Sequence, residues 1–200
     1  MKKIILASGS PRRRELMGGL DLPFTVDTRN DFEEGPVEFS DPAEVPVAMA
    51  KGKSHGFYRP LDKDELLVTA DTVVVLRTDG KPSVIGKPHS REEALAMLRS
   101  LSGNIHEVIT AVVLRDNERE ECFTDSTLVC FAELSDREIE YYVDKYKPYD
   151  KAGSYGVQEW IGYMGIERIE GSFYNVMGFP VHKVYKEIVK FADLKSEYGT

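Results

Sequence analysis

The stretch ELLVTADTVVVL, residues 65–76, is a nearly continuous run of apolar and β-branched residues. Such a run is typical of a strand that is covered on both faces, as the central strands of α/β sheets are. Asp71 interrupts it with a carboxylate. Burying an unpaired carboxylate is costly, so one in this position is normally paired, metal-bound or catalytic. The alternative is that Asp71 stands at a solvent-exposed strand end.

Strand and helix patterns alternate on both sides of this stretch, without internal repeats. Capping-box spacing at Ser90–Glu93, Ser135–Glu138 and Asp41–Glu44 marks three helix starts. We expect helices over 11–18, from the early forties to 55, over 91–101, 135–146 and 179–194, and strands over 4–7, 24–28, 83–88, 106–116, 121–134 and 165–171. Residues 149–160 are expected to form a glycine-containing loop. Because hairpins and helical crossovers both occur, the fold class is α/β with a mixed sheet.

Length and composition set further limits. Two hundred residues with 42% hydrophobic content predict one globular domain over residues 1–200, with two lobes around a cleft. A net charge of -8 argues against a stable nucleic-acid partner. The apolar run after the first residues is too short for a signal peptide, and no run approaches the ~20 residues of a membrane span. Cys122 and Cys130 lack a CxxC motif, so we expect free thiols in a soluble, cytoplasmic protein without a membrane partner.

The segment SGSPRRREL, residues 8–16, breaks a local rule. Ser10 and Pro11 predict a helix start, and three arginines follow where the helix dipole is already positive. Each cation there costs about 0.3–1 kcal/mol, and a bound polyphosphate would reverse the sign of that effect. We therefore expect Arg12 and Arg13 to bind an anion, whereas Arg14 is expected on the surface. The alternative is that the arginines pair with surface acids.

Other candidates are weaker when taken singly. Lys53 and Lys87 would supply further positive charge for a triphosphate, although a lone lysine is usually just solvated. Glu33 and Glu34 are candidates to join Asp71 around a hard cation, and the sequence does not choose between them. Gln158 offers a donor and an acceptor to the edge of a base; the alternative is a tight loop with a satisfied amide.

Seven segments together resemble the Maf family of nucleoside triphosphate pyrophosphatases over essentially the whole chain. They are LASGSPRR (6–13), ADTVV (70–74), GKP (86–88), LSG (101–103), ITAV (109–112), DKAGSYGVQ (150–158) and GSFYNVMGFPV (171–181). The resemblance implies a two-lobed α/β fold of the Maf/ITPase type, with an elongated mixed sheet around a central cleft, and it allows a homodimer. It also implies cleavage between the α and β phosphates of a nucleoside triphosphate, with Mg²⁺ or Mn²⁺ as cofactor.

The resemblance also assigns roles by position. Asp71 would be the general base and a metal contact together with Glu33 or Glu34. The phosphate ligands would be Arg12, Arg13, Lys53 and Lys87, and the residues that select the base would be Arg12, Thr72 and Gln158. The combination of SPRR, ADT and YGVQ resembles the branch that hydrolyses dTTP and UTP, with modified pyrimidine triphosphates as further candidates.

Two departures from the family pattern stand out. Gly52 lies where family members usually have a better helix former, beside Lys53. The segment QEWIGYMGIERIEG, residues 158–171, is bulkier than the family's usual run of small residues, which would alter the base pocket. The alternatives to a dTTP/UTP pyrophosphatase are a Maf enzyme with another base specificity, such as 7-methyl-GTP, and a non-catalytic nucleotide-responsive regulator of septum formation. Asp71 favours an enzyme, because a binding protein gains nothing from a base there.

Overall fold

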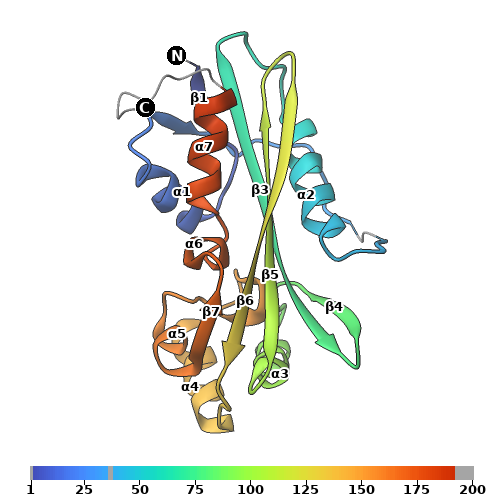
Figure 1. Cartoon of the computed structure of the whole chain (residues 1–200), viewed down its shortest axis with the longest axis vertical. Coiled ribbons are helices and arrows are strands. Elements are labelled where there is room, and N and C mark those ends of the chain that lie inside the picture. The colour runs from blue at the N-terminus through green and yellow to red at the C-terminus, as the bar shows by residue number, and fades with distance from the viewer. Residues whose placement is uncertain (1, 36–37, 192–200) are drawn as a thin grey trace. The chain divides into compact units, whose positions relative to one another are not determined.

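The computed structural model describes residues 2–35 and 38–191. Its strands are β1 (Lys3–Leu6), β2 (Phe24–Val26), β3 (Glu65–Thr78), β4 (Lys81–Ile85), β5 (Ile105–Arg115), β6 (Glu120–Phe131) and β7 (Ile166–Glu170) (Figure 1). Its helices are α1 (Pro11–Gly18), α2 (Glu44–His55), α3 (Arg91–Leu101), α4 (Asp136–Tyr146), α5 (Trp160–Gly165), α6 (Phe173–Val176) and α7 (Val181–Phe191), with a 3₁₀ turn at Ala152–Ser154. The α/β class is confirmed.

The seven described strands form one mixed sheet in the order β2-β1-β3-β5-β6-β7, and β4 pairs with β3. Strand β1 is parallel to both β2 and β3, with Ile4 opposite Phe24 and Leu66. The β3–β4 and β6–β7 pairs are antiparallel. Parallel pairs require crossover connections and antiparallel pairs accept hairpins, so the mixed sheet follows from the connections predicted along the chain.

The chain divides into two compact units, which we describe separately. The first unit comprises Met1–Asp71, Thr110–Asp125 and Gly178–Thr200, and the second comprises Thr72–Ile109 and Ser126–Met177. Strands β3, β5 and β6 contribute residues to both. A single functional domain over residues 1–200 stays a prediction.

In the first unit, helix α2 packs on the sheet. Ala50 of α2 is buried against Ala111 and Val113 of β5, and the hydroxyl of Thr69 in β3 donates to the Ala50 carbonyl at 2.8 Å. Figure 1 shows α2 running beside these two strands. The small side chains let the helix backbone approach the sheet closely, which places Lys53, one turn further on, near β3.

The second unit has the larger buried cluster. Helices α3 and α4 contribute buried leucine, isoleucine, tyrosine and valine side chains, and the loop after α4 adds Tyr155 and Val157. Salt bridges from Arg91 to Asp144 (2.6 Å) and from Arg99 to Asp136 (2.7 Å) join α3 to α4 at the surface. The loop that carries Gln158 is therefore part of the hydrophobic core at two of its positions.

Most predicted helix ends are confirmed. The Ser135–Glu138 capping box is complete, and the Ser10 and Ser90 side chains accept from the third backbone N–H of their helices. The predicted helix start in the early forties is confirmed at Glu44, but Asp41 is not the N-cap: Ala43 is, and the Asp41 carboxylate accepts from the Ala43 N–H while the Asp41 N–H donates to the Glu44 carboxylate.

Other boundaries also differ from prediction: the strand expected over 83–88 is observed as Lys81–Ile85, and the strand expected over 121–134 as Glu120–Phe131. The second strand ends at Val26, because the Asp27 carboxylate accepts from the Arg29 backbone N–H and turns the chain. Residues 149–160 contain a 3₁₀ turn and the first residue of α5, and neither α5 nor α6 was predicted. The last helix is present but begins at Val181, two residues after its predicted start at 179, and residues 192–194 of that prediction lie outside the described residues.

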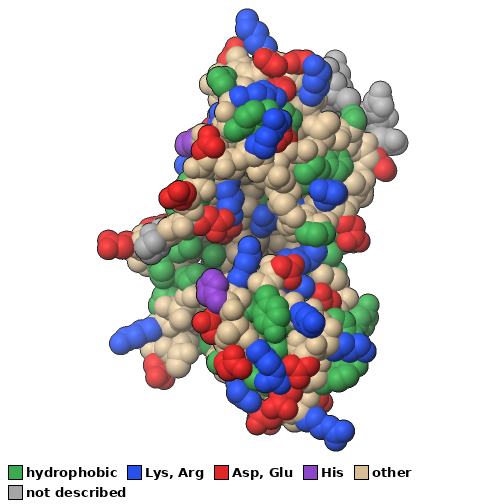
Figure 2. All heavy atoms as spheres, turned by 180° about the vertical axis from the view of Figure 1, so that it is seen from behind, with side chains coloured by type: hydrophobic (Ala, Val, Ile, Leu, Met, Phe, Trp, Pro, Cys, Tyr) green, Lys and Arg blue, Asp and Glu red, His purple; other side chains and the backbone are tan. Residues whose placement is uncertain are grey.

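Two surface properties bear on possible partners. No helix within residues 2–35 and 38–191 is both long and apolar enough to cross a membrane. On the face shown in Figure 2, Lys and Arg side chains are interspersed with Asp and Glu side chains. Interspersed charge of both signs on this face is unlike the basic stripe by which proteins bind nucleic acid.

Candidate functional site

Asp71 lies inside strand β3 and not at its end. Its side chain is 17% exposed, and Oδ1 lies 2.6 Å from Nζ of Lys53. The alternative of a solvent-exposed Asp at a strand end is therefore wrong. A carboxylate in this position needs a partner because of the desolvation cost, and the Lys53 ammonium supplies one.

Lys53 reaches Asp71 from helix α2, and its ammonium also lies 2.8 Å from Oε1 of Glu34. One cation thus stands between two carboxylates from separate segments of the first unit. Both Glu33 and Glu34 are exposed, and it is the Glu34 carboxylate that the structure places against Lys53. Among the described residues, no three His, Cys, Asp or Glu side chains lie close enough to hold a metal ion together.

The acidic loop packs on α2 through Phe32, and this contact explains why a glycine, Gly52, stands inside the helix. A Cβ atom at Gly52 would lie 2.3 Å from two ring carbons of Phe32. Asn30 donates from Nδ2 to the Lys53 carbonyl at 2.5 Å and accepts from the Phe32 N–H at 2.8 Å. The glycine in α2 therefore makes room for Phe32, two residues before Glu34, where a better helix former would not fit.

Arg13 is tied to main-chain carbonyls. Its Nε donates to the Gly178 carbonyl and its Nη1 donates to the Ala70 carbonyl, each at 2.8 Å. Burial lowers the pKa of its guanidinium from the ordinary value, although the nearby Asp71 carboxylate opposes that shift. Arg13 thus anchors helix α1 to the residue immediately before Asp71. Arg12 is half-buried and Arg14 is exposed, as expected for Arg14.

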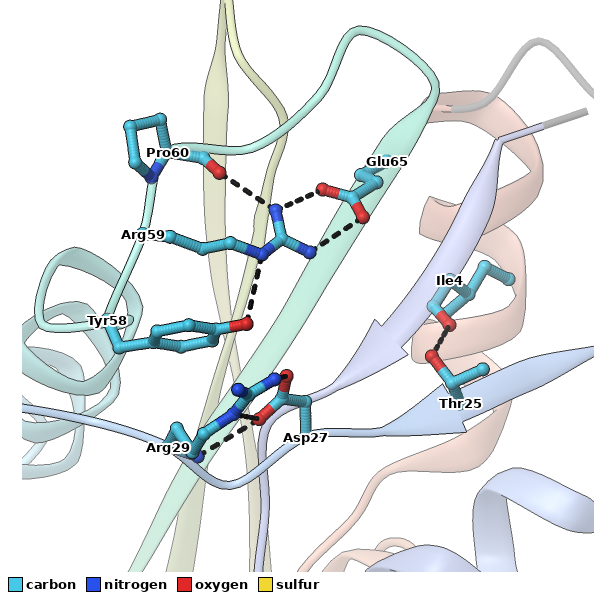
Figure 3. A network of polar contacts seen from close by, with 8 residues as sticks. All are labelled: Ile4, Thr25, Asp27, Arg29, Tyr58, Arg59, Pro60 and Glu65. Carbon is cyan, nitrogen blue, oxygen red and sulfur yellow. Dashed lines mark hydrogen bonds and ion pairs between the residues drawn. The ribbon is translucent and has the colours of Figure 1, made fainter.

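Two other arginines of the first unit are engaged in ion pairs of their own (Figure 3). Arg29 makes two hydrogen bonds to the Asp27 carboxylate and stacks 3.9 Å from the centre of the Tyr58 ring. Arg59 makes two hydrogen bonds to Glu65 at the start of β3, at 2.7 and 2.8 Å. These arginines stabilise the first unit and were not among the candidates.

The remaining candidates belong to the second unit. Thr72 is half-buried and follows Asp71 in β3, and Lys87 is exposed in the segment after β4. The Gly86 carbonyl accepts from the Gly153 N–H at 3.0 Å, which ties the Lys87 segment to the loop over residues 150–158. Within this unit the structure therefore links the segments of Lys87 and Gln158.

The alternative that the Gln158 amide is fully hydrogen-bonded within its loop does not hold. Within the described residues, its Oε1 is one of three buried side-chain N or O atoms that have no hydrogen-bond partner. Such an acceptor costs about 1–3 kcal/mol unless something supplies a donor. The position is therefore suited to an N–H group of a ligand.

A family model described as Maf-like protein matches residues 3–191. The chain belongs to the Maf-like protein family. This Maf-like chain is 52% identical over 189 residues to a dTTP/UTP pyrophosphatase of Parabacteroides distasonis, covering 94% of the chain and 96% of that relative. It is 51% identical to one of Bacteroides thetaiotaomicron (94% and 95% covered) and 49% identical to one of Porphyromonas gingivalis (96% and 95% covered).

The resemblance drawn from the seven sequence segments is thus confirmed. A solved structure of the Staphylococcus aureus Ham1 protein aligns with 95% of this Maf-like chain and with all of its own chain, at 15% identity and a TM-score of 0.49. Two features of the site were missed at the level of sequence: the contact between Gly52 and Phe32, and the network around Glu159 described below. The only signal for either was a departure from the family pattern.

Proposed function

We propose that this protein hydrolyses dTTP and UTP to the nucleoside monophosphate and pyrophosphate. The observation that carries the proposal is the Asp71 carboxylate, held inside β3 by an ammonium at 2.6 Å. Full-length relatives near 50% identity that are named dTTP/UTP pyrophosphatases support the substrate class.

In this proposal Asp71 orients a water molecule and accepts its proton. The water oxygen bonds to the α-phosphorus, the bond from the α-phosphorus to the bridging oxygen breaks, and pyrophosphate leaves. Phosphoryl transfer mainly requires positioning and stabilisation of charge on the phosphate oxygens. Lys53, Arg12, Arg13 and Lys87 are the proposed phosphate ligands. Lys53 has a third N–H to donate beyond its two carboxylate contacts.

The carboxylates of Glu34 and Asp71 fit a hard divalent cation. Mg²⁺ in phosphoryl-transfer sites is held by one or two carboxylates together with substrate phosphates. Oε1 of Glu34 and Oδ1 of Asp71 lie 2.8 and 2.6 Å from the Lys53 ammonium, so a positive charge already lies between the two carboxylates. A bound Mg²⁺ or Mn²⁺ would neutralise phosphate charge and lower the pKa of coordinated water.

Base selection is assigned to Gln158, together with Thr72 and Arg12. Uracil and thymine carry a proton on N3, whereas N3 of cytosine is an acceptor. The buried, unpaired Oε1 of Gln158 is matched to the first arrangement and repelled by the second. The proposal therefore includes a preference for UTP over CTP.

The test is to incubate the protein with UTP, dTTP, CTP and 7-methyl-GTP in Mg²⁺ or Mn²⁺ and to quantify pyrophosphate and monophosphate. With dTTP or UTP as substrate, we expect one pyrophosphate for each nucleoside monophosphate. With CTP, we expect much less of both products. Nucleotide binding without pyrophosphate release would favour a non-catalytic regulator. A preference for 7-methyl-GTP would place the chain in another branch of the family.

A further inference from the structure

Two polar side chains of the loop that carries Gln158, Lys151 and Glu159, form a network with the buried Tyr142 of α4. The hydroxyl of Tyr142, from α4, donates to the Glu159 carboxylate and accepts from the Gly156 N–H at 3.0 Å. Nζ of Lys151 lies 3.1 Å from Oε1 of Glu159 and 2.8 Å from Oδ1 of Asp150. Tyr142 is fully buried, and the Lys151 side chain is 9% exposed.

Each contact in this group is suited to hold its partner still. Burial, reinforced by the hydrogen bond to Glu159, raises the pKa of the Tyr142 hydroxyl, so that it remains a donor. The Glu159 carboxylate receives both a hydroxyl and an ammonium. Tyr142 and Lys151 are largely shielded from water, so removing the Glu159 carboxylate leaves a hydroxyl and an ammonium without that partner.

The glycines on both sides of Gln158 are closely packed. A Cβ atom at Gly156 would lie 2.8 Å from Cδ of Glu159, and one at Gly162 would lie 1.8 Å from the Val157 carbonyl oxygen. The Glu159 N–H also donates to the Gly156 carbonyl at 2.9 Å. Gln158 therefore sits between a Val157 carbonyl packed on α5 and a Glu159 side chain bound to α4.

We infer that Glu159, oriented by Tyr142 and Lys151, is a positioning residue that fixes the Gln158 amide and thereby sets base discrimination. A binding side chain is positioned accurately only when the residues beside it are themselves held by packing and hydrogen bonds. Glu159 follows Gln158 directly, and its contacts with Tyr142 and Lys151 hold the backbone from which the Gln158 amide projects. The inference rests on the role proposed for Gln158.

The test compares Tyr142→Phe and Glu159→Ala with Glu159→Gln, which keeps an acceptor for the Tyr142 hydroxyl. The matched control is Tyr146→Phe, the same change one turn later on α4, in a ring that stacks on Tyr142. The readout is the ratio of kcat/KM for UTP to that for CTP. General destabilisation lowers both values together and leaves the ratio unchanged.

We expect the UTP/CTP ratio to fall about tenfold in Y142F and E159A, and to stay within about threefold of wild type in E159Q and Y146F. Amide exchange at Gly156 should accelerate in Y142F but not in Y146F. A ratio within about twofold of wild type in both Y142F and E159A would overturn the inference.

A wild-type protein that releases no pyrophosphate would overturn the proposed function instead. In that case base preference is measured instead as the ratio of the dissociation constants for CMP and UMP. The fluorescence of Trp160, the single tryptophan of the chain and two residues from Gln158, reports their binding. Loss of UMP preference in Y142F and E159A supports the inference, and unchanged preference overturns it.

Discussion

Replacing Gly52 by alanine tests how the acidic loop is held. On helix propensity alone, Gly→Ala inside a helix stabilises by about 1 kcal/mol. The structure predicts the opposite sign, because the added Cβ would lie 2.3 Å from the Phe32 ring. Overpacking of this kind costs about 1–3 kcal/mol. We therefore expect G52A to lower the free energy of unfolding by up to about 2 kcal/mol.

The assay is urea unfolding of G52A, F32A and the double variant. With the ring removed, only the propensity gain remains, so G52A in the F32A background should stabilise by about 1 kcal/mol. This reversal of sign isolates the pairwise contact. G52A should also lower turnover, because displacement of Phe32 moves Glu34 away from Lys53. Equal stabilisation by G52A in both backgrounds would refute the reasoning.

Two further predictions concern charged groups. Arg13→Lys loses at least one of two charge-assisted hydrogen bonds and should lower the free energy of unfolding by about 1.5–3 kcal/mol. Arg14→Lys, at an exposed position, should change it by less than about 0.5 kcal/mol, and equal urea midpoints for the two variants would contradict the anchoring role of Arg13. The hydrogen bonds from Arg59 hold the pKa of Glu65 below its ordinary 4.5, so its stabilisation is complete above pH 4.5 and is lost as the pH falls through the folded-state pKa. The melting temperature of Glu65→Gln should therefore depend less on pH in that acidic range than that of wild type, and parallel curves would exclude the contribution.

Local rules predicted much of the fold. Capping signals at Ser10, Ser90 and Ser135 gave three helix starts, and the apolar run around Asp71 gave the central strand. The capping signals depend on residues three apart, and the strand signal depends on consecutive apolar residues. The short helices α5 and α6 were missed because six and four residues carry too little periodicity.

The candidate residues were found as violations of local rules, but their partners were not. Arg13 binds the Gly178 carbonyl 165 positions away, and Tyr142 binds Glu159 17 positions away. No periodicity encodes such pairs, because tertiary packing creates them. The sequence likewise could not choose between Glu33 and Glu34, because only the folded chain brings Glu34 to Lys53. The roles of these residues in catalysis stay predictions.

The most direct test of the central claim is the turnover of UTP by Asp71→Asn. This change preserves shape and removes the proton acceptor held at Lys53. We predict that kcat for pyrophosphate release falls about 10²–10⁴-fold, as general-base catalysis requires. Affinity for UMP, followed by Trp160 fluorescence, should change only modestly. A variant that keeps more than about a tenth of wild-type kcat would contradict the account.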